Sequence, residues 1–134
     1  MPQTEFSDAL VARLRAALPA LQIAERAAVY AQGGPAAGVV TYSVGYAPAG
    51  DSNNRMTAVT VDIDIWTAGP DLVAADNIAS AIEDTLVDWS AVTARQGRVR
   101  LLTASRSPVP DTDEKLAHVT MIIQGRSFRR LSNV

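Results

Sequence analysis

The strongest pattern in the sequence is an alternation of apolar and polar residues between positions 59 and 66. The apolar members of this alternation are Val59, Val61, Ile63 and Ile65, and the residues that follow them are Thr60, Asp62, Asp64 and Trp66. A period of two places successive side chains on opposite faces of a strand. The segment therefore predicts a strand with one buried face and one mostly polar face.

Two other segments have the period of an amphipathic helix. The apolar stripe of the first is formed by Phe6, Leu10, Leu14, Ala17, Leu18 and Leu21. Pro19 predicts that this helix ends at the residue before it, because proline disfavours helical geometry in its predecessor. The second stripe is formed by Leu72, Ala75, Ala79, Ile82, Leu86 and Trp89. Pro70 and Asp71 are residues typical of a helix start.

Three further segments, residues 39–46, 98–105 and 116–128, have the composition and alternation of strands. The segments between the elements, residues 31–38, 48–55 and 106–114, contain the Gly, Pro and Asp that are typical of loops. Residues 22–30 fit either a helical extension or an extended connector, and the sequence leaves both open.

The resulting order, α-β-β-α-β-β, predicts a single α+β domain over residues 1–134. We expect a four-stranded, mainly antiparallel sheet with two helices packed on one face. The other face is then open and carries Asp62, Asp64, His118 and two large apolar side chains, Trp66 and Ile122. Apolar groups on an open sheet face predict contact with a partner.

Composition supports one globular domain and removes several functional classes. The chain has 134 residues, of which 48% are hydrophobic, and a formal net charge of −2, so sequence-independent binding to DNA is not implied. It contains no Cys, which excludes disulfides and thiol nucleophiles. The first residues have no apolar segment of the secretory kind and no run is long enough to span a bilayer, so we expect a cytosolic product with no membrane partner.

Charge is unevenly distributed along the chain. Residues 1–94 carry 4 Arg against 11 acidic groups, a net charge of −7, whereas residues 95–134 carry 8 basic groups against 3 acidic ones, a net charge of +5. Such a distribution fits complementary surfaces that meet between copies of the chain, and equally two solvated surfaces.

The sequence lacks the motifs of common catalytic and cofactor sites. The glycines of segment 33–38 have phosphate-loop spacing, but Val39 and Val40 stand where Lys and Ser or Thr are required. No G-x-S-x-G nucleophile elbow is present. His118 is the only histidine, which excludes a multi-histidine zinc site, and its strand pattern predicts a hydrogen-bonded sheet residue.

The carboxylates of Asp62 and Asp64 share one strand face and could bind a cation or act as an acid–base pair. Either activity needs more convergent polar groups than the sequence places near them. We therefore predict no catalytic, metal or cofactor site, and no enzyme. The two aspartates are read instead as an acidic strip, solvated or facing a pore. Arg126, Arg129 and Arg130 are predicted to line a solvated end or a subunit contact.

From about residue 39 to residue 128, the chain resembles the tail terminator or tail completion family of long-tailed bacteriophages, of the lambda tail protein U type. The features that carry the resemblance are the strand Val59-Thr-Val-Asp-Ile-Asp-Ile-Trp66, the helix that follows it with Ile78-Ala-Ser-Ala-Ile82, and the closing strand His118-Val-Thr-Met-Ile-Ile123. The N-terminal segments 22–30 and 31–38 match the family pattern less well.

The resemblance implies a virion structural protein of the tail, assembled in the host cytoplasm. It implies a homo-oligomer, a hexameric ring, that caps the tail tube, ends polymerisation of the tube protein and offers a head-joining surface to the head connector protein. DNA is then only passing cargo. Asp62, Asp64, Trp66, Ile122, Arg126, Arg129 and Arg130 are the expected lumen or interface residues. A head–tail adaptor of the neck and a non-phage cytosolic interaction module are the alternatives.

Overall fold

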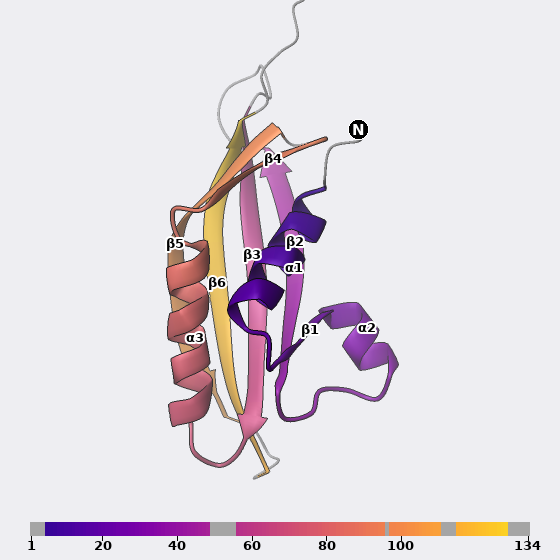
Figure 1. The fold of residues 1–134 in the computed structure, drawn as a ribbon, viewed down its shortest axis with the longest axis vertical. Coiled ribbons are helices and arrows are strands. Elements are labelled where there is room, and N and C mark those ends of the chain that lie inside the picture. Colours follow the sequence, from indigo (N-terminus) through magenta and orange to yellow (C-terminus); the bar gives the residue numbers. More distant parts are fainter. Residues whose placement is uncertain (1–4, 49–55, 96, 111–114, 129–134) are drawn as a thin grey trace, which may run out of the picture.

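The computed structural model describes residues 5–48, 56–95, 97–110 and 115–128. Within them the chain forms helices and strands in the following order: α1 (Phe6–Ala17), β1 (Gln22–Glu25), α2 (Arg26–Ala31), β2 (Val39–Pro48), β3 (Met56–Ala68), α3 (Val73–Leu86), β4 (Ser90–Thr93), β5 (Gly97–Val109) and β6 (Leu116–Phe128). Figure 1 shows the long strands running side by side, with α1 and α3 in front of them. No helix in the described ranges is long and apolar enough to cross a membrane.

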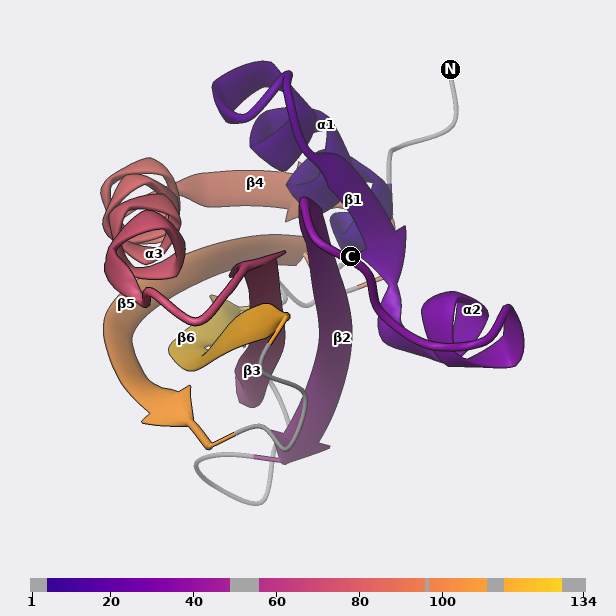
Figure 2. The ribbon, with the colours of Figure 1, turned by 90° about the horizontal axis from the view of Figure 1, so that it is seen from below.

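The strands form one mixed, six-stranded sheet in the order β1-β2-β3-β6-β5-β4. Strands β1 and β2 are parallel, and every other neighbouring pair is antiparallel. The longest ladder joins β3 to β6 from Met56 opposite Phe128 to Ala68 opposite Leu116. Viewed along the strands, the sheet is strongly curled into a half-barrel (Figure 2).

The prediction of a four-stranded sheet with two helices on one face is wrong. The structure adds β1 and β4 at the two edges of the sheet, and it adds a third helix, α2. Each added strand has four residues and α2 has six. Segments this short contain too few residues for a period to be recognised. The two short strands form because they pair with the longer β2 and β5. A local sequence pattern does not show such pairing.

The predicted loop at residues 106–114 is also partly wrong, because β5 continues to Val109. Residues 111–114 lie outside the described part of the chain. The predicted strand 116–128 is confirmed as β6, and residues 39–46 form most of β2.

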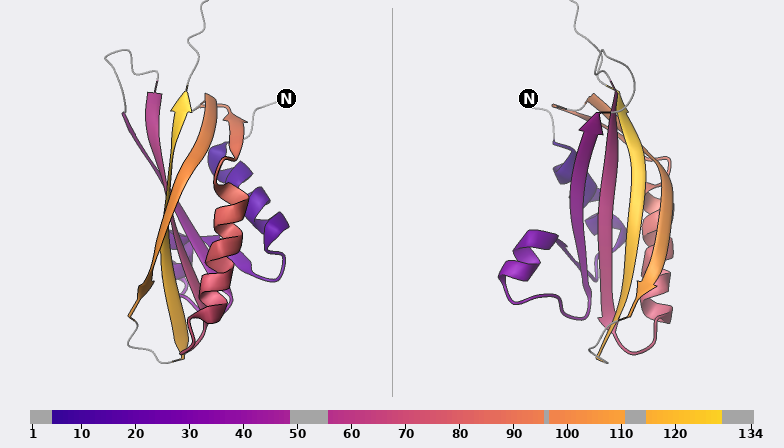
Figure 3. Two further views of the ribbon diagram at one scale, coloured as in Figure 1. Left: turned by 90° about the vertical axis from the view of Figure 1, so that its left-hand side faces the viewer. Right: turned by 180° about the vertical axis from the view of Figure 1, so that it is seen from behind.

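The hydrophobic core lies between the sheet and the two longer helices, which lie on the same side of the sheet in the edge-on view of Figure 3. The core side chains of α1 and α3 are Phe6, Leu10, Leu14, Ala75, Ala79, Ile82 and Leu86, all at most 1% exposed. They meet the alternating apolar residues of β3 and β6 that the sequence predicts. Complete burial of one large apolar side chain contributes about 1.5–3 kcal/mol, so this contact is the main stabilising interaction between the helices and the sheet.

The curl of the sheet has a local cause where β5 crosses β6. The register between these strands shifts between Leu101 and Thr103, which is a β-bulge, and Gly125 lies opposite Leu101. An added Cβ at Gly125 would overlap the carbonyl oxygen of Arg100 and lie 2.8 Å from Leu101 Cα. Bulges bend a strand, and glycine permits close backbone approach. Together they bring β5 tightly over β6.

Both edges of the sheet are only half covered in the described ranges. Strand β1 pairs with residues 39–42 of β2 and leaves residues 43–48 with a neighbour on one side only. Strand β4 pairs with residues 97–100 of β5, so residues 103–109 of β5 also have a neighbouring strand on one side only. The two free segments lie at opposite ends of the sheet, because β2 and β5 run in opposite directions.

We predict that Gly125→Ala destabilises the fold by about 2 kcal/mol or more, because the atoms that a Cβ meets are backbone and cannot rotate away. Urea denaturation monitored by circular dichroism measures the change. Gly45→Ala is the matched control on β2, since no atom lies within 4 Å of a Cβ there, and it should change stability by less than about 1 kcal/mol. Equal stability of both variants would show that β5 and β6 are not in close backbone contact at Gly125.

Candidate assembly surface

The face of the sheet opposite α1 and α3 carries the site residues predicted from the sequence. In the β3–β6 ladder, Asp62 lies opposite Ile122, and two residues further along, Asp64 lies opposite Thr120. Trp66 and Arg126 occupy the same face by alternation. The structure therefore brings these side chains to one surface, whereas Arg129 and Arg130 lie outside the described residues.

Helix α2 covers one end of this face. Asp64 and Trp66 are only 6% and 2% exposed, although a four-stranded sheet would leave them open. Arg26, the first residue of α2, donates from Nη2 to Asp64 Oδ2 at 2.5 Å. The other carboxylate oxygen, Oδ1, lies 2.8 Å from Nε2 of His118. Asp64 thus has both of its partners within its own chain.

Aromatic rings extend the contact between α2 and this face of the sheet. The imidazole of His118 stacks on the indole of Trp66 with centroids 4.4 Å apart and an interplanar angle of 20°. The ring of Tyr30, from the end of α2, meets the same indole edge-on at 6.5 Å and 77°. Val29, the residue before Tyr30 in α2, is also buried. We call Arg26, Tyr30, Asp64, Trp66 and His118 the α2 clamp.

The α2 clamp contains an Asp–His pair, which in other settings serves catalysis. Here the imidazole faces the carboxylate through Nε2 and covers Trp66 with its ring. Thr41, directly across from Asp64 on β2, is completely buried, and its hydroxyl has no hydrogen-bond partner in the described residues. No group of three or more metal-ligating side chains occurs in the described ranges. The arrangement fits attachment of α2, and the prediction that His118 is a hydrogen-bonded sheet residue is confirmed.

The remainder of this face is accessible. Asp62 is half-buried, Ile122 is 40% exposed, and Arg126 is exposed, donating from Nη1 to the carbonyl of Gly125 at 3.0 Å. Arg126 lies opposite Arg100 of β5. Like charges in such a position repel, and Asp88 offsets this by lying 3.2 Å from Arg100 Nη2. The face therefore changes from acidic near Asp62 to basic near Arg126.

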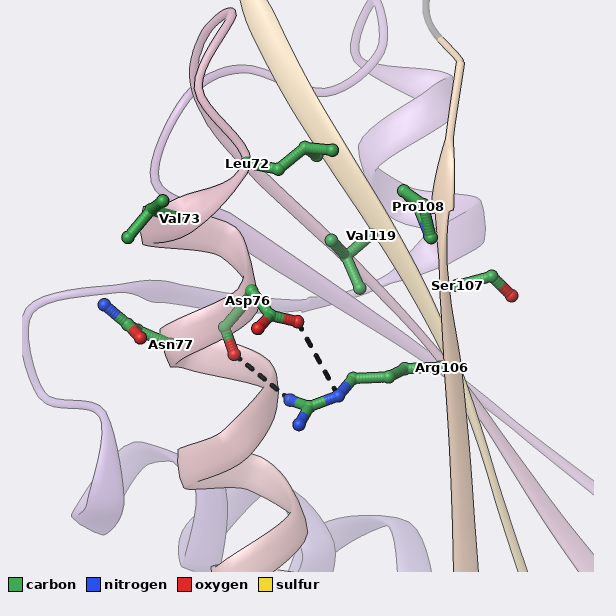
Figure 4. Close-up of a pocket in the computed structure, with 8 residues that line it drawn as sticks. All are labelled: Leu72, Val73, Asp76, Asn77, Arg106, Ser107, Pro108 and Val119. Carbon is green, nitrogen blue, oxygen red and sulfur yellow. Dashed lines mark hydrogen bonds and ion pairs between the residues drawn. The ribbon is translucent and has the colours of Figure 1, made fainter.

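A separate groove of about 360 Å³ lies on the helix side of the sheet, between the start of α3 and the end of β5 (Figure 4). Its walls are Leu72, Val73, Asp76, Asn77, Arg106, Ser107, Pro108 and Val119. Arg106 crosses the groove and donates from Nη1 to the Asp76 carbonyl at 3.1 Å and to Ser80 Oγ at 2.9 Å. Val73 is 60% exposed at its rim.

Two tyrosines lie on the helix side of β2, Tyr42 directly before its free segment and Tyr46 within that segment. Burial raises the pKa of Tyr42 above its ordinary value of 10.0, and the carboxylate of Glu25 adds to this effect. Burial, followed by the charge of Glu5, likewise raises the pKa of Tyr46. Both phenols are therefore neutral at physiological pH. Tyr46 is 43% exposed.

The sequence did not identify Arg26 and Tyr30 as partners of the predicted site. Both lie in segment 22–30, which fits a helix and a connector equally. The usable signal was a single Arg followed at helical spacing by Val29 and Tyr30. Such a pattern indicates a short helix with one apolar side, but not which surface it covers.

The chain matches a known protein family and shares its fold with a chain of a solved virion structure. A family model described as "Tail completion protein gp17" matches residues 8–126. Among solved structures, a chain from "Virion of native gene transfer agent (GTA) particle" matches with a TM-score of 0.66 at 18% sequence identity, over 92% of this chain and 95% of that chain. At that identity the match shows a shared fold. No significant match is found among curated proteins.

We predict that Arg26→Ala lowers the free energy of unfolding by about 1–3 kcal/mol, because it leaves a largely buried carboxylate with one partner fewer. Amide exchange across α2 should accelerate at the same time. Arg95→Ala is the matched control: its ion pair with Glu5 is far more exposed and should contribute less than about 1 kcal/mol. Unchanged exchange in α2 of the Arg26→Ala protein would contradict the clamp.

Proposed function

The chain belongs to the tail completion protein gp17 family, and from this membership we propose that it is a non-enzymatic subunit of a virion tail whose copies close into a ring on the tail tube. The observation that carries the proposal is the family match, which spans nearly the whole described chain, residues 8–126. The ring ends polymerisation of the tube protein and provides the surface that joins the head connector.

A non-enzymatic role is supported by the state of the polar groups. The one Asp–His pair in the described residues is enclosed by α2, Trp66 and Tyr30. General acid–base catalysis needs a group within hydrogen-bond reach of a substrate. Asp64 is 6% exposed and its carboxylate is already bonded twice, so it is poorly placed for that task.

A ring role is supported by the accessible part of the sheet face. Asp62, Ile122 and Arg126 combine negative charge, apolar area and positive charge within two adjacent strands. We assign Asp62 to the lumen, where repeated negative charge repels passing DNA and limits adhesion. We assign Ile122 and Arg126 to contacts with other virion proteins. Asp64 and Trp66 act indirectly, by attaching α2.

We expect closed homo-oligomers, namely hexamers, when the protein is concentrated or supplied with tail tubes. Surfaces that meet head to tail generate rings when the rotation closes. Size exclusion with light scattering at low and high protein concentration measures the mass. A strict monomer at both concentrations, with no assembly on added tubes, would contradict the ring.

We expect Asp62→Asn to leave the subunit folded and the ring intact while disturbing DNA passage, because it removes one lumen charge per subunit. Asp84→Asn, an exposed change on α3, is the matched control. Ejection of DNA from assembled particles is the readout. If Asp62→Asn weakens the ring instead, this carboxylate belongs to an interface; if the variant behaves as the parent in both assays, it is merely solvated.

A further inference from the structure

The two free edge segments of the sheet are complementary in several respects. Residues 43–48 of β2 and residues 103–109 of β5 each have a strand on one side only in the described ranges. An unpaired strand edge presents a row of N–H and C=O groups that can pair with another chain. The segments differ in length by one residue, and they run in opposite directions within one sheet.

We propose that the free edge of β2 in one copy pairs with the free edge of β5 in the next copy, so that the curled sheets continue into one another around the ring. This inference rests on the proposed function, since it names the contact by which the ring closes. The partner is a second copy of this chain, and the contact is antiparallel strand addition.

Sheet continuity fixes the register. The side chains that face the helices have even numbers on both strands: Tyr42, Val44 and Tyr46 on β2 and Ala104, Arg106 and Pro108 on β5. A shift of one residue would turn every side chain to the wrong face. The register that keeps the faces and pairs all of residues 43–48 places Ser43 opposite Val109 and Pro48 opposite Ala104. Each segment carries a proline near one end, so the central residues keep their N–H groups.

This register gives the groove beside β5 an occupant. It places Tyr46 of one copy opposite Arg106 of the next, on the helix side, where Arg106 crosses the groove between α3 and β5. A tyrosine ring near a guanidinium gains a cation–π contact. An exposed aromatic group and a partly apolar groove thus meet at the same joint.

The positions of the two segments also fit closure. Strand β1 occupies the beginning of β2, and β4 occupies the beginning of β5, so each copy must be displaced along the strands relative to its neighbour. A sheet that closes into a barrel requires tilted strands and a stagger of the register. Because β1 and β4 each cover only the beginning of the neighbouring strand, each copy is displaced along the strands in the same direction relative to the copy before it.

Engineered cysteines test the pairing directly, because the chain has no Cys of its own. Gly45 and Ser107 are exposed and directly opposite in the proposed register. Within one copy they are separated by three strand spacings, roughly 14 Å, which no disulfide spans. The Cα atoms of directly opposite residues in antiparallel strands lie about 4.5–5.5 Å apart, which a disulfide can span. The double variant Gly45→Cys, Ser107→Cys should therefore form links between copies only.

Under mild oxidation of the assembled protein, we expect this double variant to run as a ladder of covalent oligomers on a non-reducing gel, with most chains linked. Each single variant should give no ladder, because only one partner is present. Ala12→Cys with Ser107→Cys is the control for non-specific oxidation, since Ala12 is an exposed residue of α1 that takes no part in the proposed pairing. Ala47→Cys with Ser105→Cys belongs to the same register and provides an independent second pair.

Failure of the inference and failure of the proposed function give different results. If light scattering shows closed oligomers but neither cysteine pair links, the edge pairing is wrong and the copies are joined by another contact. If both pairs link but tail tubes are neither bound nor capped, the edge pairing holds and the tail role is wrong. Monomers without links, with or without tubes, contradict both.

Discussion

The ladder between β3 and β6 is the interaction on which the rest of the structure depends. Its thirteen paired positions are continuous from Met56 to Ala68, and strand alternation divides its side chains between two faces of different chemistry. One face is wholly apolar over Val59 to Ile65 and binds α1 and α3. The other face carries carboxylates, a histidine and a tryptophan. The core and the candidate assembly surface are therefore two consequences of one pairing.

Enclosure of part of the polar face follows from the chain entering the sheet at its edge. Strand β1 runs parallel to β2 and leads directly into α2. The chain consequently passes to the polar side before β2 begins. Burial of Asp64 there is tolerable because Arg26 and His118 both contact its carboxylate, as a buried charge requires. The result is a polar sheet face of two zones, one occupied by α2 and one left accessible around Asp62 and Ile122.

Long periodic segments were predictable from the sequence and short ones were not. The alternation at Val59–Trp66 and the stripe of α3 identify their elements because several residues repeat the same signal. Four-residue β1 and β4 carry no such repetition, and their pairing partners lie outside the local sequence. For the site, alternation placed Asp62, Asp64 and Trp66 on one face, but it gave no information on α2. The difference between Asp62, which is accessible, and Asp64, which is buried, depends on that one tertiary contact.

We propose that copies of this chain close into a ring at the end of a tail tube, and electron microscopy of negatively stained tail tubes mixed with the purified protein is the decisive test of this proposal. We expect a closed ring of density at one end of each tube and tubes that no longer lengthen when fresh tube protein is added. Tubes with bare ends that continue to grow at the same rate would contradict it.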